Sequence, residues 1–137
     1  MKKLALLLLT VLAFVSCNTS PDKYIGIQLY SVRDDMQKAP EETVAKVGEM
    51  GYSFVEAAGY ADGKFYGMEP VDFKALVEEN NMDFLSSHTG QNMPDSANWE
   101  NTMAWWDTCI DAQVAAGVKY IVQPFMGGAG YDSIAGL

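Results

Sequence analysis

Basic residues, histidine and cysteine are all scarce in this chain of 137 residues. Nine lysine and arginine residues stand against 18 aspartate and glutamate residues, which gives a formal net charge of −9 at pH 7. Without residues 1–16, which carry two of the lysines, the net charge becomes −11. So acidic a surface argues against the binding of nucleic-acid phosphates or anionic lipids through charge. We therefore expect no nucleic-acid partner.

Cysteine and long apolar runs are limited as well. Cys17 and Cys109 are the two cysteines, so modification of Cys17 would leave Cys109 alone and exclude an internal disulfide. Cys109 falls within a helical pattern, and we expect a small, partly buried core residue rather than a nucleophile. The apolar run at residues 4–15 has twelve positions, which is too short for a bilayer, because a spanning helix needs about 20 residues.

The N-terminus has the pattern of a secretory signal. Lys2 and Lys3 precede the apolar run, and small residues follow it. The tetrapeptide "FVSC" (14–17) resembles the lipobox of bacterial lipoproteins, in which the cysteine becomes the lipidated first residue, although Phe14 stands where leucine is usual. We expect a signal peptide at 1–16, a tether at 17–23 and an exported, membrane-anchored protein on the periplasmic side or in the outer membrane. The alternative is an ordinary signal peptide with an incidental cysteine.

The remaining residues, 24–137, are enough for one ordinary domain, and strand-like and helix-like segments alternate along them. The segments rich in β-branched and aromatic residues are 23–32, 53–59, 82–87 and 118–125. The segments with helical periodicity are 40–51, 69–81 and 97–116. Pro40 suits the first turn of the first helix, and Gly51 suits its end.

Each predicted helix has an apolar stripe that we expect to face the core. The stripes are Val44, Val47 and Met50; Val71, Phe73, Leu76 and Val77; and Trp99, Met103, Trp106, Ile110 and Val114.

Four successive βα-type units predict an α/β fold with a parallel sheet and right-handed crossovers. The strands begin near residues 24, 53, 82 and 118, at separations of 29, 29 and 36 residues. A TIM barrel of about 250 residues allots about 31 residues to each of its eight units. The sequence therefore predicts a partial barrel in which about four of the eight parallel (β/α) units are present. The alternative is a small, open, doubly wound sheet.

Each predicted strand carries a polar residue near its C-terminal end: Gln28, Glu56, His88 and Gln123. Alternate residues of a strand lie on the same face, so each polar residue shares the inward face with its neighbours two positions away. Gly26 and Tyr30 lie with Gln28, Phe54 with Glu56, Phe84 and Ser86 with His88, and Ile121 and Phe125 with Gln123. Ligands of parallel α/β folds bind at the carboxyl ends of the strands. This edge is therefore the candidate site.

Each of these polar residues also has a structural interpretation. Glu56 could form a salt bridge or accept from a loop amide, and Gln28 and Gln123 could bond to neighbouring backbone. His88 could be a core or capping imidazole with its hydrogen bonds satisfied. We favour a site role for His88, because it leads from "FLSS" into a loop that opens with Thr89 and Gly90.

Three segments, "IGIQLYSVRDDM", "GYSFVEAAGY" and "FLSSHTG", resemble the first strand–loop segments of the sugar phosphate isomerase/epimerase family, the xylose-isomerase-like TIM barrels. The likeness runs from about Tyr24 to Phe125. It implies a (β/α)8 barrel, a divalent metal (Mn²⁺, Mg²⁺ or Zn²⁺) and isomerisation or epimerisation of a sugar. In that family the metal polarises substrate oxygens and stabilises an enediolate, while two carboxylates exchange a proton at the adjacent carbon.

The metal ligands and paired glutamates of the family lie on later strands, so the catalytic residues of this protein are unknown and this chain alone is expected to be inactive. The resemblance carries over Gln28, Tyr30, Glu56 and His88 as substrate-facing groups, and the strand pattern adds Gln123. One histidine and one glutamate on adjacent strands do not make a metal site by themselves.

Two other functions stay open from the sequence. The same metal-dependent chemistry could drive a sugar lyase or a glycoside-cleaving enzyme, and a non-catalytic carbohydrate-binding lipoprotein could retain the rim of the site without the carboxylates. Export favours a free sugar or glycoside over a phosphorylated one. A half-barrel would leave two sheet edges open, and open edges invite self-association.

We predict that Cys17 is acylated and that the protein fractionates with membranes. Stable anchoring takes more than one acyl chain, so the mass of the mature protein should exceed that of the polypeptide from Cys17 onward by several acyl groups. Intact-mass spectrometry of the membrane fraction measures this. A soluble product that retains a free Cys17 thiol would contradict the lipoprotein interpretation.

Overall fold

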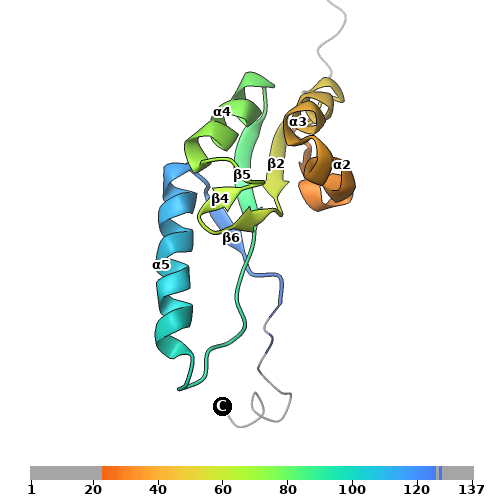
Figure 1. Ribbon diagram of the computed structural model, residues 1–137. Helices are drawn as coiled ribbons and strands as arrows, with labels where there is room; N and C mark the ends of the chain where they lie inside the picture. Colours follow the sequence, from red (N-terminus) through yellow and green to blue (C-terminus); the bar gives the residue numbers. More distant parts are fainter. Residues whose placement is uncertain (1–22, 126, 128–137) are drawn as a thin grey trace, which may run out of the picture.

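The computed structural model describes residues 23–125 and 127 (Figure 1). The elements in chain order are β1 (Gly26–Gln28), the 3-10 helix η1 (Leu29–Val32), α2 (Arg33–Lys38), α3 (Pro40–Glu49), β2 (Phe54–Ala57), β3 (Tyr60–Ala61), β4 (Lys64–Phe65), α4 (Pro70–Glu79), β5 (Asp83–His88), α5 (Trp99–Ala115) and β6 (Tyr120–Val122). The predicted signal peptide, tether and Cys17 lie outside the described residues.

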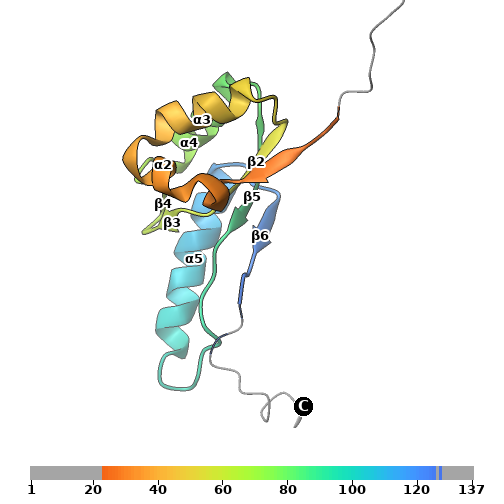
Figure 2. The same ribbon diagram turned by 90° about the vertical axis from the view of Figure 1, so that its right-hand side faces the viewer.

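Four strands form one parallel sheet in the order β1-β2-β5-β6. The four α helices lie on one side of this sheet (Figure 2), and they pack in chain order, α2 on α3, α3 on α4 and α4 on α5. A doubly wound sheet reverses its strand order at a switch point, whereas here the order follows the chain. The prediction of a partial TIM barrel is therefore confirmed.

The first predicted strand, 23–32, is wrong in its second half. The strand ends at Gln28, and the chain continues through η1 into the six-residue helix α2. Asp34 and Asp35 occupy the first turn of α2, and Lys38 occupies its last turn. These charges complement the helix dipole and favour α2, which begins just after the predicted strand. The residues wrongly predicted as strand, 29–32, form η1.

A small antiparallel hairpin, β3 and β4, also escaped prediction. Tyr60 pairs with Phe65 and Ala61 with Lys64, and the connecting residues Asp62 and Gly63 have φ values of 50° and 79°. Two consecutive left-handed residues make the tight turn that suits a hairpin, and Asp-Gly is a preferred sequence for it. The dipeptide in "YADGKF" was therefore an available signal.

The core is built around three phenylalanines from three different elements. The ring centroid of Phe84 in β5 lies 5.0 Å from that of Phe65 in β4 and 5.0 Å from that of Phe73 in α4. All three side chains are buried, and both pairs are nearly perpendicular, a favourable arrangement worth about 0.5–1.5 kcal/mol per pair beyond area burial. This contact fixes the hairpin and α4 against the sheet.

The predicted core-facing stripe of the third helix is wrong. Trp99 is 55% exposed and Val114 is 72% exposed, whereas α5 buries Cys109, Ala112 and Gln113. Of the rest of the predicted stripe, Met103 and Trp106 are half-buried and Ile110 is exposed. Met50 and Val71, also expected in the core, are exposed. The expectation that Cys109 is a core residue is confirmed.

None of the helices within the described ranges combines the length and the apolar character needed to cross a bilayer.

Strands β1 and β6 form the two ends of the sheet, and β6 is exposed throughout. We expect the full chain to self-associate through these edges, because unpaired strand edges pair with other chains. Ile121→Lys should shift elution in size-exclusion chromatography towards the monomer, and Val71→Lys, at an exposed position of α4, serves as the matched control. A monodisperse wild-type monomer whose β6 amides are protected from hydrogen exchange would contradict this expectation.

Candidate functional site

Three strands bring polar side chains into contact at their carboxyl ends. Gln28 Nε2 donates a hydrogen bond of 2.6 Å to Glu56 Oε1, and Ser86 Oγ donates one of 2.6 Å to Glu56 Oε2. The three residues come from β1, β2 and β5, which are neighbours in the sheet. We call Gln28, Glu56 and Ser86 the carboxylate row. It lies at the edge of the sheet where parallel α/β folds bind ligands.

The register of the sheet creates this row. Gln28 pairs with Glu56, and Glu56 pairs with Ser86. The pairing of β2 with β5 shifts between Val55 and Glu56, so that Val55 lies opposite Phe84 and Leu85 is passed over. A bulge of this kind re-aims the side chains that follow it.

The shift corrects one of the predicted groupings. Strand alternation placed Phe84 on the same face as Ser86, but Phe84 packs on Phe73 of α4 while Ser86 contacts Glu56. The two side chains therefore lie on opposite faces of the sheet. Ser86 was assigned to the inward face but was not identified as a site residue, although its two-residue spacing from His88 was a usable signal.

Ser87 marks the helix-covered face of the same strand. Its Oγ accepts a hydrogen bond of 3.2 Å from Gln113 Nε2 of α5. Ile121 pairs with Ser87 and so lies on this face as well, which makes its predicted inward position wrong. His88 pairs with Val122 one residue further, on the face of the carboxylate row. The structure therefore places His88 at the end of β5, half-buried and beside that row.

An aromatic layer lies beneath the carboxylate row. A Cβ atom at Gly26 would overlap the ring of Phe54, so the absence of a side chain at Gly26 lets that ring lie across β1. The ring of Tyr24 packs on Phe54 at 4.8 Å between centroids. The inner face is thus apolar near the start of the strands and polar at their ends.

The side chain of Gln123 forms hydrogen bonds with the backbone of two neighbouring segments. Its Nε2 donates hydrogen bonds to the carbonyl oxygens of Gln91, at 2.6 Å, and Phe125, at 2.5 Å. The amide thereby ties the loop after β5 to the segment after β6. Backbone bonding was one of the two interpretations of this residue, and its contact with substrate stays a prediction.

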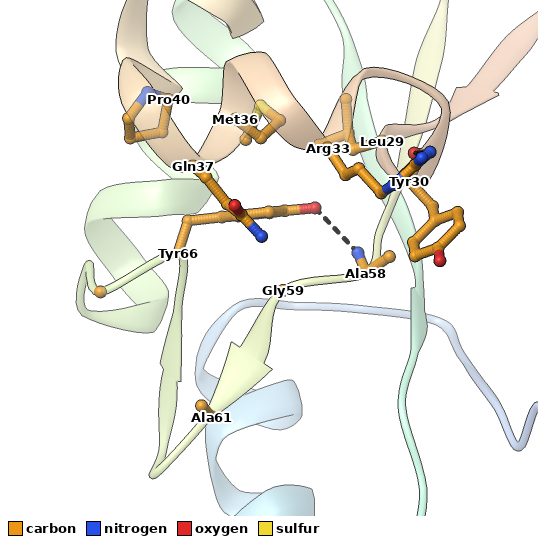
Figure 3. Close-up of a pocket in the computed structure, with 11 residues that line it drawn as sticks. Leu29, Tyr30, Arg33, Met36, Gln37, Pro40, Ala58, Gly59, Ala61 and Tyr66 are labelled. Carbon is orange, nitrogen blue, oxygen red and sulfur yellow. Dashed lines mark hydrogen bonds between the residues drawn. The ribbon is translucent and has the colours of Figure 1, made fainter.

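Tyr30 does not continue the strand face of Gln28, because it lies in η1. Its ring carries the guanidinium of Arg33, with Cζ 4.8 Å from the ring centroid, and its carbonyl oxygen accepts a hydrogen bond of 3.3 Å from Arg33 Nη1. Both residues line a cavity of about 430 Å³ between the η1–α2 segment and the chain that follows β2 (Figure 3).

Tyr66 closes the far wall of this cavity and fixes the chain beyond Glu56. Its hydroxyl oxygen accepts a hydrogen bond of 2.9 Å from the backbone N–H of Ala58 (Figure 3), and its backbone has a φ of 51°, an uncommon value for a bulky residue. Burial raises the pKa of Tyr66 to about 12. The phenol therefore stays neutral at physiological pH.

Within the described residues, no group of three or more histidine, cysteine, aspartate or glutamate side chains could hold a metal ion. The two oxygens of Glu56 are already acceptors for Gln28 and Ser86. Burial raises the pKa of the Cys109 thiol, which disfavours the thiolate that a metal or a nucleophilic role would need. These residues do not by themselves fit the divalent metal that the family resemblance implies.

Comparison with solved structures gives strong matches. A sugar phosphate isomerase/epimerase from Parabacteroides distasonis ATCC 8503 superposes with a TM-score of 0.69 at 28% sequence identity, over 77% of this chain and 42% of the matched chain. A second sugar phosphate isomerase/epimerase from the same organism superposes with a TM-score of 0.67 at 21% identity, over 82% of this chain and 42% of the matched one. The second likeness shows the fold alone.

This chain thus spans about two fifths of the length of these solved structures, and the partial coverage fits an N-terminal half of their barrel. No family model matches the sequence. No curated protein matches it either.

We predict that Tyr66→Phe destabilises the full chain at pH 7, because it leaves the Ala58 N–H without its acceptor at a cost of about 1 kcal/mol. Between the ordinary tyrosine pKa of 10.0 and the folded value of about 12, the unfolded chain loses this proton while the folded chain keeps it. Stability therefore falls as pH rises through this window.

Urea titrations from pH 7 to 12 should show that Tyr66→Phe flattens this alkaline loss of unfolding free energy. Tyr120→Phe, at an exposed tyrosine, is the control and should leave the midpoint at pH 7 unchanged. An alkaline slope identical in Tyr66→Phe and wild type would contradict the assignment.

Proposed function

We propose that this chain forms the first half of the barrel of an enzyme that isomerises or epimerises a sugar, with the sugar held at the carboxyl ends of β1, β2 and β5. The observation that carries the proposal is the carboxylate row, in which residues from three strands meet at one carboxylate. A solved sugar phosphate isomerase/epimerase that is 28% identical and superposes with a TM-score of 0.69 adds support.

The carboxylate row suits the binding and orientation of a polyhydroxylated ligand. Each carboxylate oxygen has a second lone pair beyond the one that receives Gln28 or Ser86, so Glu56 can accept from sugar hydroxyls while its position stays fixed. Gln28 retains an amide oxygen and a second N–H, and His88 offers a ring nitrogen at the end of β5. Fixed donors and acceptors of this kind lower the barrier by holding the reacting carbon in place.

In the proposed reaction a proton leaves the carbon beside the sugar carbonyl and returns to the neighbouring carbon, through an enediolate. The proposed cofactor is Mn²⁺, Mg²⁺ or Zn²⁺, and its ligands would have to come from residues other than those that the structure describes. The described residues bind and orient the sugar, and we assign no proton-transfer step to them.

The proposed setting is the exported side of a membrane, with lipid at Cys17 as the anchor. A free sugar or glycoside fits that setting, and self-association through β1 and β6 is the proposed protein contact. Detection of acyl groups on Cys17 by intact-mass spectrometry is the test of this setting.

A non-catalytic carbohydrate-binding lipoprotein is the second candidate function. The observation in its favour is that both oxygens of Glu56 accept short hydrogen bonds from neighbouring side chains, an arrangement suited to a fixed acceptor rather than to a mobile base. A binder of this kind would hold sugars without any exchange of their carbon-bound hydrogen.

We predict that His88→Asn in the full-length protein lowers turnover at least tenfold, which corresponds to about 1.4 kcal/mol of transition-state stabilisation. D-xylose, D-glucose or D-fructose would be incubated with the protein in D2O with added Mn²⁺, and conversion to the corresponding isomer or epimer would be followed. The readout is deuterium at the carbon beside the carbonyl. The melting temperature should change only slightly. Unchanged kinetics together with a large drop in melting temperature would make His88 structural.

Glu56→Gln should lower sugar affinity or turnover by a similar factor, because it removes the charged acceptor at the centre of the carboxylate row. Glu49→Gln, at the exposed end of α3, removes one carboxylate elsewhere and should change neither quantity. Sugar binding that depends on Glu56 in a protein without deuterium incorporation would favour the carbohydrate-binding candidate over the enzyme.

A further inference from the structure

The chain after β5 and the chain after β6 stay side by side beyond the end of the sheet (Figure 2). The N–H of Thr89 donates a hydrogen bond of 3.1 Å to the Val122 carbonyl oxygen, and the N–H of Met93 donates one of 2.7 Å to the Gly127 carbonyl oxygen. Both segments leave the sheet at the carboxyl ends of the strands, where we place the sugar. They therefore form part of the mouth of the candidate site, and His88 is the last strand residue before the first segment.

The side chain of Gln123 joins the two segments between those backbone hydrogen bonds. Its Nε2 donates both to the Gln91 carbonyl of the first segment and to the Phe125 carbonyl of its own, which engages the two donors that a primary amide carries. Pro124 follows directly and restricts the backbone of Gln123 to extended conformations. The bond within its own segment thus holds the amide in the orientation that reaches the other segment.

A glycine lies where this amide crosses the first segment. A Cβ atom at Gly90 would overlap the amide group of Gln123, and the amide could move aside only by giving up its hydrogen bonds. The backbone of Gly90 is not left-handed, so a methyl group there would meet the amide without added backbone strain. The contact is repeated in the other direction, because a Cβ atom at Gly127 would overlap the amide oxygen of Asn92.

The backbone on both sides of His88 is held in place. Before it, Ser87 is fully buried and accepts a hydrogen bond of 3.2 Å from Gln113 of α5. After it, the chain is held by the Thr89 hydrogen bond and by the Gln123 amide. His88 itself is half-buried at the last position of β5, so the surroundings of its ring depend on where the following residues run.

We propose that Gln123 is a positioning residue, which fixes the chain after His88 and through it the imidazole at the mouth of the site, and that the absence of a side chain at Gly90 admits its amide. The inference rests on the proposed function and explains how one of its sugar-facing groups is held. It gives Gln123 an indirect role instead of the contact with sugar that the strand pattern predicted. An imidazole held in place by its surroundings orients a hydroxyl group more precisely than one that can move.

The single histidine of the sequence makes the proposal measurable without a sugar. In the full chain, freed of any histidine tag, the ring protons of His88 give one set of NMR signals, and their chemical shifts report the surroundings of the ring. Gln123→Ala should shift these signals. It should also speed hydrogen exchange at the Thr89 and Met93 amides about tenfold, the effect of losing one ordinary hydrogen bond. Unchanged histidine signals in folded Gln123→Ala protein would overturn the proposal.

Gly90→Ala tests the same contact from the other segment. Its methyl group should displace the Gln123 amide and shift the His88 signals as Gln123→Ala does. In the Gln123→Ala background the amide is absent, so Gly90→Ala should add no further shift, as expected for two residues that act through one contact. Gln91→Ala is the matched control, because it shortens a glutamine of the same segment, keeps the carbonyl that accepts from Gln123 and should leave the signals in place. Additive shifts from the two substitutions would overturn the role of Gly90.

Kinetics separate this proposal from the proposed function. Gln123→Ala should lower kcat for D-xylose about tenfold with little change in KM, because a displaced group orients the reacting carbon poorly. A raised KM at unchanged kcat would instead mean that Gln123 binds the sugar directly, and would overturn the positioning role. Turnover that is indifferent to Gln123 would leave the isomerase function standing and remove that role. Shifted His88 signals in a protein without any deuterium incorporation would retain the positioning role and remove the enzyme.

Discussion

A carboxylate within a parallel sheet needs partners, and the arrangement of the inner face depends on how Glu56 obtains them. Its two oxygens accept from Gln28 on one neighbouring strand and Ser86 on the other. The second bond exists only because β2 and β5 change register between Val55 and Glu56. Glu56 is half-buried, and a charge removed from water is costly unless it is hydrogen-bonded. The bulge places Ser86 where it can donate such a bond. Phe84 lies just before this shift, on the opposite face of the sheet, where it packs on Phe73 of α4 and closes the aromatic core.

The core and the candidate site are coupled through the hairpin that follows β2. Phe65 of β4 enters the core against Phe84, and the next residue, Tyr66, reaches back to the N–H of Ala58. Tyr66 therefore fixes the chain just beyond Glu56, and Tyr66 is itself fixed because its neighbour Phe65 is buried in the core. Residues of a binding site gain precision when rigid elements support them. The left-handed backbone of Tyr66 is compatible with such support, because uncommon conformations persist where the surrounding structure determines them.

The sequence predicted the parallel (β/α) order and the polar strand ends, since both follow from periodicity and from residue type. It placed Ser86 and His88 on the inner face but also placed Phe84 there, because alternation assumes an unbroken pairing and the bulge at Leu85 interrupts it. It also misassigned α5, where the helical spacing of apolar residues from Trp99 to Val114 suggested a core-facing stripe. The buried face of α5 carries instead the smaller Cys109 and Ala112, together with Gln113. The Asp62–Gly63 turn carried a readable signal that strand and helix periodicity do not include.

The positions of the polar groups divide the proposed work among parts of the barrel. Barrel enzymes draw their catalytic residues from the ends of several strands, and the strands described here contribute an amide, a carboxylate, a hydroxyl and an imidazole that are suited to holding hydroxyl groups. A fixed carboxylate whose oxygens are already hydrogen-bonded orients a sugar well and moves protons poorly. In the proposed enzyme, proton transfer and metal binding would therefore fall to residues other than those that the structure describes. A sugar oriented by Glu56, Gln28 and Ser86 would present its opposite side to those residues.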